Sequence, residues 1–161
     1  MPFGFYIIMA AQFFSSLADN ALLVAAIALL IQMAAPEWMT PLLKFFFTVS
    51  YVIFAAFVGA FADSMRKGRV MFITNLVKIF GCVLMFLTAW LSEAGDSWYI
   101  LVLATYSVVG LGAAAYSPAK YGILTEYLPH HKLVVANGWI EGLTVASIIL
   151  GTLLGGLLVS E

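Results

Sequence analysis

Three charged residues lie deep inside apolar segments that are long enough to cross a membrane. Asp19 is near the middle of the first segment, and Lys78 and Glu141 each lie about eight residues into a later one. A charge near the centre of a bilayer costs roughly 2.5–3.5 kcal/mol, so the three together cost on the order of 8–10 kcal/mol. We therefore expect them to face a hydrated cavity or one another.

Other polar residues recur around these charges at helical spacing. Positions three or four apart lie on the same face of a helix. Three polar stripes follow from this rule: Gln12, Ser16, Asp19 and Asn20; Asn75, Lys78 and Cys82; Asn137, Glu141 and Thr144. We expect all three stripes to point into a helical bundle.

Two interpretations of the buried charges remain open. In the structural one, Asp19 and Lys78 form an ion pair that only fastens two helices together. In the functional one, Asp19 and Glu141 serve a transport path, with proton or cation coupling as one use, because one lysine cannot neutralise two carboxylates. The sequence alone does not decide between them.

The sequence shows no pattern typical of an enzyme, a cofactor site or a metal site. There is no glycine-rich phosphate loop, no nucleophile elbow and no metal-ligand spacing. Cys82 is the single cysteine, which excludes an internal disulfide. His130 and His131 are interpreted as solvated loop residues. The net charge of −1, with no basic stripe, argues against a nucleic-acid partner.

The composition places the chain in a lipid environment. Apolar residues make up 64% of it and charged residues 9%, with a mean hydropathy of +1.07. Soluble domains are roughly 45–50% apolar and about 25% charged. Within lipid, only helices and closed barrels satisfy the backbone, and the apolar runs here are too long and continuous for barrel strands. The prediction is an all-α integral membrane protein.

Five segments are long enough to span the hydrocarbon core, at about 20 residues each. They cover residues 5–33, 42–62, 70–91, 98–117 and 133–159. We expect one partial transporter domain, because an odd number of helices suggests that a second half is absent.

The connections between these segments predict their orientation. The loop before residue 70 carries Arg66, Lys67 and Arg69, and residues 118–132 carry Lys120 and Lys132. Residues 92–97 carry two anions and no cation, although Lys44 lies just inside the second segment. Cations favour the cytoplasmic side, which predicts an inside N-terminus.

The loop at residues 59–69 (GAFADSMRKGR) has a distinctive arrangement. It resembles the G-x-x-x-D-(R/K)-x-G-(R/K)-(R/K) loop of the major facilitator superfamily, with Gly59, Asp63 and Lys67 at matching positions. Arg66 stands in place of the usual glycine, and Arg69 follows the displaced Gly68. The resemblance implies a conformational loop formed by Gly59, Asp63, Arg66, Lys67 and Arg69, which stabilises the outward-open state. The alternative is a plain cationic anchor on the cytoplasmic side.

Three further stretches narrow the resemblance: residues 18–23 (ADNALL), 112–124 (GAAAYSPAKYGIL) and 136–141 (ANGWIE). Together they resemble the bacterial lysophospholipid transporter family of the major facilitator superfamily. The resemblance implies an N-terminal bundle of a multi-pass carrier in the cell inner membrane. Such carriers move lysophospholipids, notably lysophosphatidylethanolamine, from the outer to the inner leaflet by alternating access. An acyltransferase or acyl-ACP synthetase partner, sometimes fused to the carrier, then re-acylates them.

Under this resemblance, the substrate path is expected to include the polar residues of the first, third, fourth and fifth segments: Asp19, Asn20, Lys78, Tyr116, Lys120, Tyr121, Asn137 and Glu141. Lys120 would meet a substrate phosphate or the membrane lipids of the inner leaflet. One alternative is a facilitator that moves drugs or small solutes. A second is a non-transporting membrane fragment or binding partner. A membrane enzyme ranks third.

Overall fold

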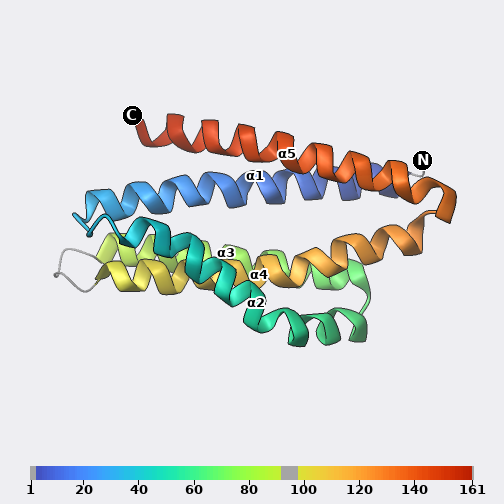
Figure 1. The fold of residues 1–161 in the computed structure, drawn as a ribbon, viewed down its shortest axis with the longest axis horizontal. Helices are drawn as coiled ribbons and strands as arrows, with labels where there is room; N and C mark the ends of the chain where they lie inside the picture. The colour runs from blue at the N-terminus through green and yellow to red at the C-terminus, as the bar shows by residue number, and fades with distance from the viewer. Residues whose placement is uncertain (1–2, 92–97, 161) are drawn as a thin grey trace.

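The structure is a computed structural model that describes residues 3–91 and 98–160, and every regular element in these ranges is an α-helix. The helices are α1 (Phe3–Gln32), α2 (Met39–Ser64), α3 (Lys67–Leu91), α4 (Trp98–Tyr127) and α5 (His130–Ser160). All five are long and apolar enough to cross a membrane, and they lie alongside one another in Figure 1. The predicted class, an all-α membrane protein with about five spans, is confirmed. The predicted acidic loop at 92–97 lies outside the described residues.

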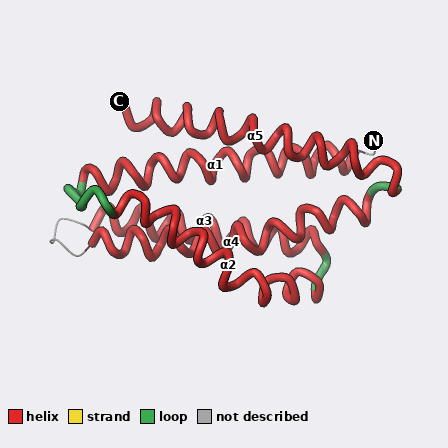
Figure 2. The backbone as a smooth tube through the Cα atoms, in the orientation of Figure 1, coloured by secondary structure: helices red, strands yellow, loops and turns green. Residues whose placement is uncertain are grey.

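The helices form two groups. α1 packs along α5, while α2 and α3 both pack against α4 (Figure 2). Among the described residues, α4 carries the largest set of buried side chains. Apolar clusters join the two groups near both ends of α1. One contains Ala26 and Leu30, and another contains Phe5 and Met9. The middle of α1, which carries its polar stripe, therefore lies between these two apolar clusters.

One end of the bundle gathers three parts of the chain. The start of α1, the α2–α3 turn and the α4–α5 turn all lie there, at the right-hand end of the bundle in Figure 1. Arg66 lies in the α2–α3 turn, Lys67 and Arg69 lie in the first turn of α3, and Lys132 lies in the first turn of α5. By the positive-inside rule this is the end expected in the cytoplasm, so the inside N-terminus stays a prediction.

Pro118 does not end the fourth helix, so the predicted limit at residue 117 is wrong. α4 continues through Pro118 to Tyr127, and Leu128 and Pro129 alone separate it from α5. Neighbouring helices and hydroxyl side chains make proline tolerable within membrane helices. The Ser117 hydroxyl donates to the Ala113 carbonyl at 3.3 Å, next to the Ala114 carbonyl that Pro118, lacking an N–H, leaves without its usual helical donor. The consequence is that Lys120 lies on a helix and not in a loop.

The assignment of the two histidines to a loop is also wrong. His130 and His131 form the start of α5, which begins directly after Pro129, and both are exposed. The backbone N–H of Lys132 donates to the Pro129 carbonyl at 2.9 Å, which closes the turn. The limits of the other four helices differ from the predicted ones by at most three residues.

The two pairs of glycines spaced four apart on α5 behave differently. A Cβ atom on Gly151 would lie 2.5 Å from the Leu17 carbonyl oxygen, and one on Gly155 would lie 2.9 Å from Val24 Cβ. This pair therefore makes a close helix contact, against α1. Gly138 and Gly142 have nothing within 4 Å of such an atom among the described residues, so that pair makes no comparable contact.

This difference predicts opposite outcomes for the same substitution. Gly151→Leu is expected to destabilise the bundle by about 1–3 kcal/mol, because the new side chain must force α5 away from α1. Gly142→Leu, on the same helix, should cost far less because its surroundings are open. Thermal unfolding in detergent, followed by circular dichroism, measures both. Equal losses in the two variants would contradict the packing described here.

Candidate functional site

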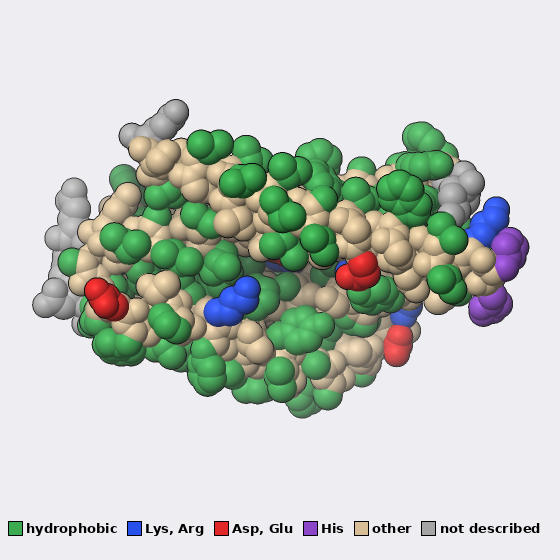
Figure 3. Space-filling view, turned by 45° about the horizontal axis from the view of Figure 1, so that its top comes forward, with side chains coloured by type: hydrophobic (Ala, Val, Ile, Leu, Met, Phe, Trp, Pro, Cys, Tyr) green, Lys and Arg blue, Asp and Glu red, His purple; other side chains and the backbone are tan. Residues whose placement is uncertain are grey.

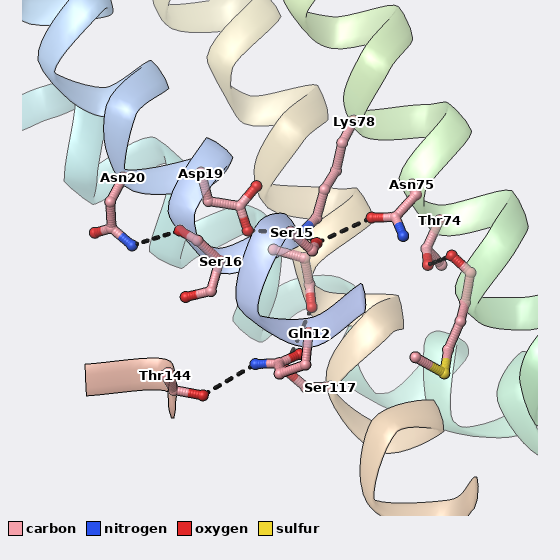
Figure 4. Close-up of polar contacts among 12 residues, drawn as sticks. Gln12, Ser15, Ser16, Asp19, Asn20, Thr74, Asn75, Lys78, Ser117 and Thr144 are labelled. Carbon is pink, nitrogen blue, oxygen red and sulfur yellow. Dashed lines mark hydrogen bonds and ion pairs between the residues drawn. The ribbon is translucent and has the colours of Figure 1, made fainter. Parts of the chain in front are cut away.

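The polar stripe of α1 meets the stripe of α3 at a buried ion pair. Lys78 Nζ lies 2.6 Å from Asp19 Oδ2 and donates to Ser15 Oγ at 3.0 Å (Figure 4). Ser15 in turn donates to Asn75 Oδ1 at 3.0 Å. The Lys78 ammonium also lies 5.0 Å from the ring centroid of Tyr116. The ion pair that the sequence offered as a structural interpretation is confirmed, and it joins the two helix groups.

Ser15 is a member of this cluster that the sequence analysis missed. It bridges α1 and α3 through its bonds to both Lys78 and Asn75. The signal was present, since Ser15 precedes Asp19 by four residues and therefore lies on the same helical face. Ser16, which was selected, also lies beside the polar cavities described below.

A second polar contact joins α1 to α5. Gln12 Nε2 donates to Thr144 Oγ1 at 3.0 Å (Figure 4), and the Thr144 hydroxyl donates to the Ile140 carbonyl at 2.8 Å. Both residues belong to the predicted stripes of their helices. The stripes of α1 and α5 therefore meet at this point.

Glu141 has a cation of its own. Its Oε1 accepts a hydrogen bond from the Tyr121 hydroxyl at 2.5 Å and lies 3.8 Å from Lys120 Nζ. The Lys120 ammonium also lies 4.5 Å from the Tyr121 ring centroid. The premise that one lysine must serve both carboxylates is therefore wrong. Because α4 continues past Pro118, Lys120 reaches the position from which it can pair with Glu141.

The two side chains of the Lys120–Glu141 pair differ in their exposure to solvent. The Lys120 side chain is 8% exposed and that of Glu141 is 54% exposed, and their 3.8 Å separation is long for a charge-assisted hydrogen bond. Water screens the carboxylate far more than it screens the ammonium. Lys120 is thus a buried cation with a weak partner, whereas Lys78 is a buried cation with a close one.

Two small polar cavities follow these contacts. The first, of about 160 Å³, is lined by Gln12, Ser15, Ser16, Asp19, Lys78, Ala113, Tyr116, Ser117, Lys120 and Thr144. The second, of about 200 Å³, is lined by Ser16, Asp19, Asn20, Leu23, Lys44, Phe47, Tyr106 and Ile148. Both include Ser16 and Asp19, so they adjoin at the α1 stripe. Figure 3 shows a side of the bundle on which separate charged side chains stand among apolar ones beside a hollow.

The structure brings most of the predicted path residues together. Asp19, Lys78, Tyr116 and Lys120 line the first cavity, and Asn20 lines the second. Glu141 and Tyr121 sit next to this group through Lys120. Asn137 lies apart: it is exposed and lines neither of these two cavities.

Lys44 and Tyr106 are cavity residues that the sequence analysis did not select. Both line the second cavity together with Asp19. Lys44 could have been found by the rule applied to the other charges, because it lies within an apolar segment. Tyr106 gave no such signal, since an aromatic residue in a membrane helix is ordinary.

The α2–α3 turn holds an exposed ion pair. Lys67 Nζ lies 2.7 Å from Asp63 Oδ1 and also donates to the Ala62 carbonyl at 3.0 Å. The Asp63 side chain is 82% exposed. The backbone N–H groups of Arg69 and Val70 both donate to the Arg66 carbonyl, which sets the first turn of α3. The proposed conformational role of this turn, including Gly59, stays a prediction.

The bundle combines five membrane-length helices with polar cavities that charged side chains line. This combination is typical of a membrane carrier. The Major Facilitator Superfamily model matches residues 8–161, and the chain belongs to this superfamily.

Among curated proteins, the chain is similar to the lysophospholipid transporter LplT of Klebsiella pneumoniae strain 342, with 45% identity over 157 residues. The LplT proteins of Yersinia enterocolitica and Salmonella typhimurium are 45% and 46% identical over 155 residues. Each match covers 96% of this chain and 36% of the relative, so the chain spans about a third of their length. No solved structure matches. The predicted resemblance to the lysophospholipid transporter family is confirmed.

Proposed function

We propose that these five helices form one wall of a carrier that moves lysophospholipids from the outer to the inner leaflet of the bacterial inner membrane. The observation that carries the proposal is the buried and weakly paired Lys120 ammonium at a small polar cavity of the bundle. Such a group suits a phosphate that enters from lipid. The names of the similar LplT proteins support the same substrate class.

The size of the cavity suggests how an amphiphile would be held. Ligand pockets for drug-sized molecules measure roughly 300–1,000 Å³. The cavity beside Lys120, at about 160 Å³, is smaller and suits a headgroup without its acyl chain. The headgroup would travel along the polar stripes of α1, α3 and α5 while the tail stays in the lipid.

Alternating access requires two bundles that rock about a site near the midplane of the membrane. In the proposed carrier, Asp19, Asn20 and Glu141 belong to the N-terminal wall. The exposed Asp63–Lys67 pair at the α2–α3 turn can exchange partners at low cost, because exposed pairs contribute only about 0–1 kcal/mol. We expect the N-terminus and this turn to face the cytoplasm.

The chemistry of the product defines the partner. A lysophospholipid delivered to the inner leaflet carries a free glycerol hydroxyl that must be esterified before the lipid returns to the bilayer pool. The proposed partner is therefore an acyltransferase or acyl-ACP synthetase, separate or fused to the carrier. The helices themselves would perform no covalent step.

A chimaera tests the transport function. The matched segment of the Klebsiella relative is replaced by this chain, and the product is reconstituted in proteoliposomes. We expect labelled lysophosphatidylethanolamine to move between leaflets, and Asp19→Asn to slow this movement about tenfold or more, because the Lys78 ammonium loses its counter-charge. The chain alone, without an opposing wall, should move none.

Competing functions give different results in the same proteoliposomes. A carrier of drugs or small solutes would accumulate a water-soluble cation or organic anion and leave the lysolipid in place. The small volume of the cavity, about 160 Å³, also suits a small solute, and this observation supports the alternative. A chimaera that folds and moves neither class of compound would contradict both transport proposals.

A further inference from the structure

Two buried polar atoms beside the first cavity lack a hydrogen-bond partner among the described residues. They are the Gln12 Oε1 oxygen and the Tyr116 hydroxyl. Both residues are only 4% exposed, and both line the cavity of about 160 Å³. Buried polar groups are almost always hydrogen-bonded, and an unmade bond is expensive. Two such atoms beside one cavity indicate a missing partner that can both donate and accept.

The surrounding bonds fix what Gln12 can offer. Its Nε2 donates to Thr144 Oγ1, and the hydrogen of that hydroxyl is already given to the Ile140 carbonyl. With that hydrogen on Ile140, Thr144 accepts from Gln12, and this network assigns the amide orientation that leaves Oε1 without a partner. Gln12 Oε1 is left as a pure acceptor, and it needs a donor.

Tyr116 and Lys120 define the rest of the site. The unpartnered Tyr116 hydroxyl can donate a hydrogen bond. The Lys120 ammonium lines the same cavity, and its carboxylate partner Glu141 is distant at 3.8 Å and is held by Tyr121. Beside the Asp19–Lys78 pair, the cavity lining thus includes an unpartnered acceptor, an unpartnered hydroxyl and a weakly paired cation.

We propose that this cavity recognises the free glycerol hydroxyl of a lysophospholipid and so separates lysolipids from diacyl lipids. The hydroxyl donates to Gln12 Oε1 and accepts from the Tyr116 hydroxyl, while the phosphate on the neighbouring carbon meets Lys120. The inference rests on the proposed function, and it adds that the glycerol hydroxyl is the part of the substrate that the cavity recognises.

The chemistry of the two lipid classes explains the discrimination. In a diacyl lipid the hydroxyl is an ester, which has no hydrogen to give to Gln12 and carries a chain that the cavity cannot hold. A site built to bond a substrate hydroxyl discriminates strongly against an analogue that lacks it, because its own buried groups are then unpaired. One such bond corresponds to about a ten- to hundredfold difference in affinity.

Equilibrium binding to the chimaera described above, reconstituted in lipid nanodiscs, tests this inference, with this chain as its unmodified N-terminal segment. Three labelled ligands are compared after subtraction of empty nanodiscs: 1-acyl lysophosphatidylethanolamine, its 2-deoxy analogue and diacyl phosphatidylethanolamine. We expect the unmodified chimaera to prefer the lysolipid over the deoxy analogue by about ten- to hundredfold. Gln12→Met and Tyr116→Phe should each reduce this ratio to about threefold or less, mainly by weakening lysolipid binding.

Matched controls separate recognition from folding. Gln32→Met on α1 and Tyr127→Phe on α4 change the same residue types at exposed positions and should leave the ratio unchanged. The ratio is measured within one preparation, so a smaller folded fraction affects both ligands equally.

Each other outcome has a definite meaning. Equal binding of the lysolipid and its deoxy analogue by the unmodified chimaera would overturn the inference and leave the proposed function standing. The same holds if both variants keep the full preference, or if either loses both ligands, since the side chain then belongs to the framework. Binding of none of the three lipids by the unmodified chimaera would instead count against the proposed function itself.

Discussion

Lys78→Met is expected to destabilise the bundle by about 3 kcal/mol, because it leaves the Asp19 carboxylate among the helices without its cation. The pair is close, at 2.6 Å, with side-chain exposures of 8% for Lys78 and 24% for Asp19. Lys78 also donates to Ser15, so the substitution removes a second bond between α1 and α3. Unfolding in detergent, followed by circular dichroism, measures the loss.

The double variant separates the pair from its members. Replacing both partners of a buried ion pair by apolar side chains is often neutral or stabilising, whereas removing one is costly. Asp19→Leu combined with Lys78→Met should therefore recover most of the stability lost by Lys78→Met alone. A double-mutant cycle over the four proteins gives the coupling energy of Asp19 and Lys78.

The turn between α2 and α3 provides a matched control. Asp63 and Lys67 lie at 2.7 Å, nearly the same distance, but the Asp63 side chain is 82% exposed. Their cycle should give only about 0.2–1 kcal/mol, as for other ion pairs that water screens, although the Lys67 side chain is 15% exposed. Equal coupling energies in the two cycles would mean that burial does not set the strength of the Asp19–Lys78 pair.

Transport by the double variant shows whether the Asp19–Lys78 pair does more than stabilise the bundle. If the pair only fastens α1 to α3, the double variant should transport normally once it is stable. If the pair also serves the substrate path, the double variant should be stable and inactive. The two interpretations that the sequence left open are thus distinguished by one protein.

The fold class was predictable because a lipid solvent leaves few choices. Long apolar runs must form helices, and their lengths fix the spans within a few residues. The exception was α4, which was predicted to end at residue 117 and continues through Pro118 to Tyr127. Proline is tolerated inside membrane helices, where neighbouring helices and hydroxyl side chains surround the freed backbone groups.

The sequence predicted which face of each helix carries the polar residues of the site, but not which residues of the neighbouring helices they contact. Asp19 was found as a charge deep in an apolar segment, and helical spacing then identified which side of α1 is polar. The same spacing cannot tell which helix lies opposite, and ending the fourth segment at residue 117 placed Lys120 in a loop, so its pairing with Glu141 was missed. Tertiary packing decides such contacts, as the glycines of α5 also show: Gly142 and Gly151 look alike in sequence, but only Gly151 is packed.

Lys120→Gln is expected to weaken lysophosphatidylethanolamine binding by about ten- to hundredfold, because a charge-assisted bond to the phosphate is lost. Lys120 is 6% exposed and lines the cavity with Gln12 and Tyr116. Lys132→Gln, on the exposed first turn of α5, removes the same charge far from the cavity and should change affinity about twofold at most. Equilibrium binding in nanodiscs measures both variants.

Glu141→Gln should act in the opposite direction. It removes the carboxylate that competes with the phosphate for Lys120, so affinity should rise, by about threefold or less because Glu141 is half exposed. The glutamine can still accept from Tyr121, which preserves the α4–α5 contact. A fall in affinity in both Lys120→Gln and Glu141→Gln would show that the pair orders the site as a unit. Opposite signs would identify Lys120 as the group that receives the phosphate and Glu141 as the group that the substrate displaces.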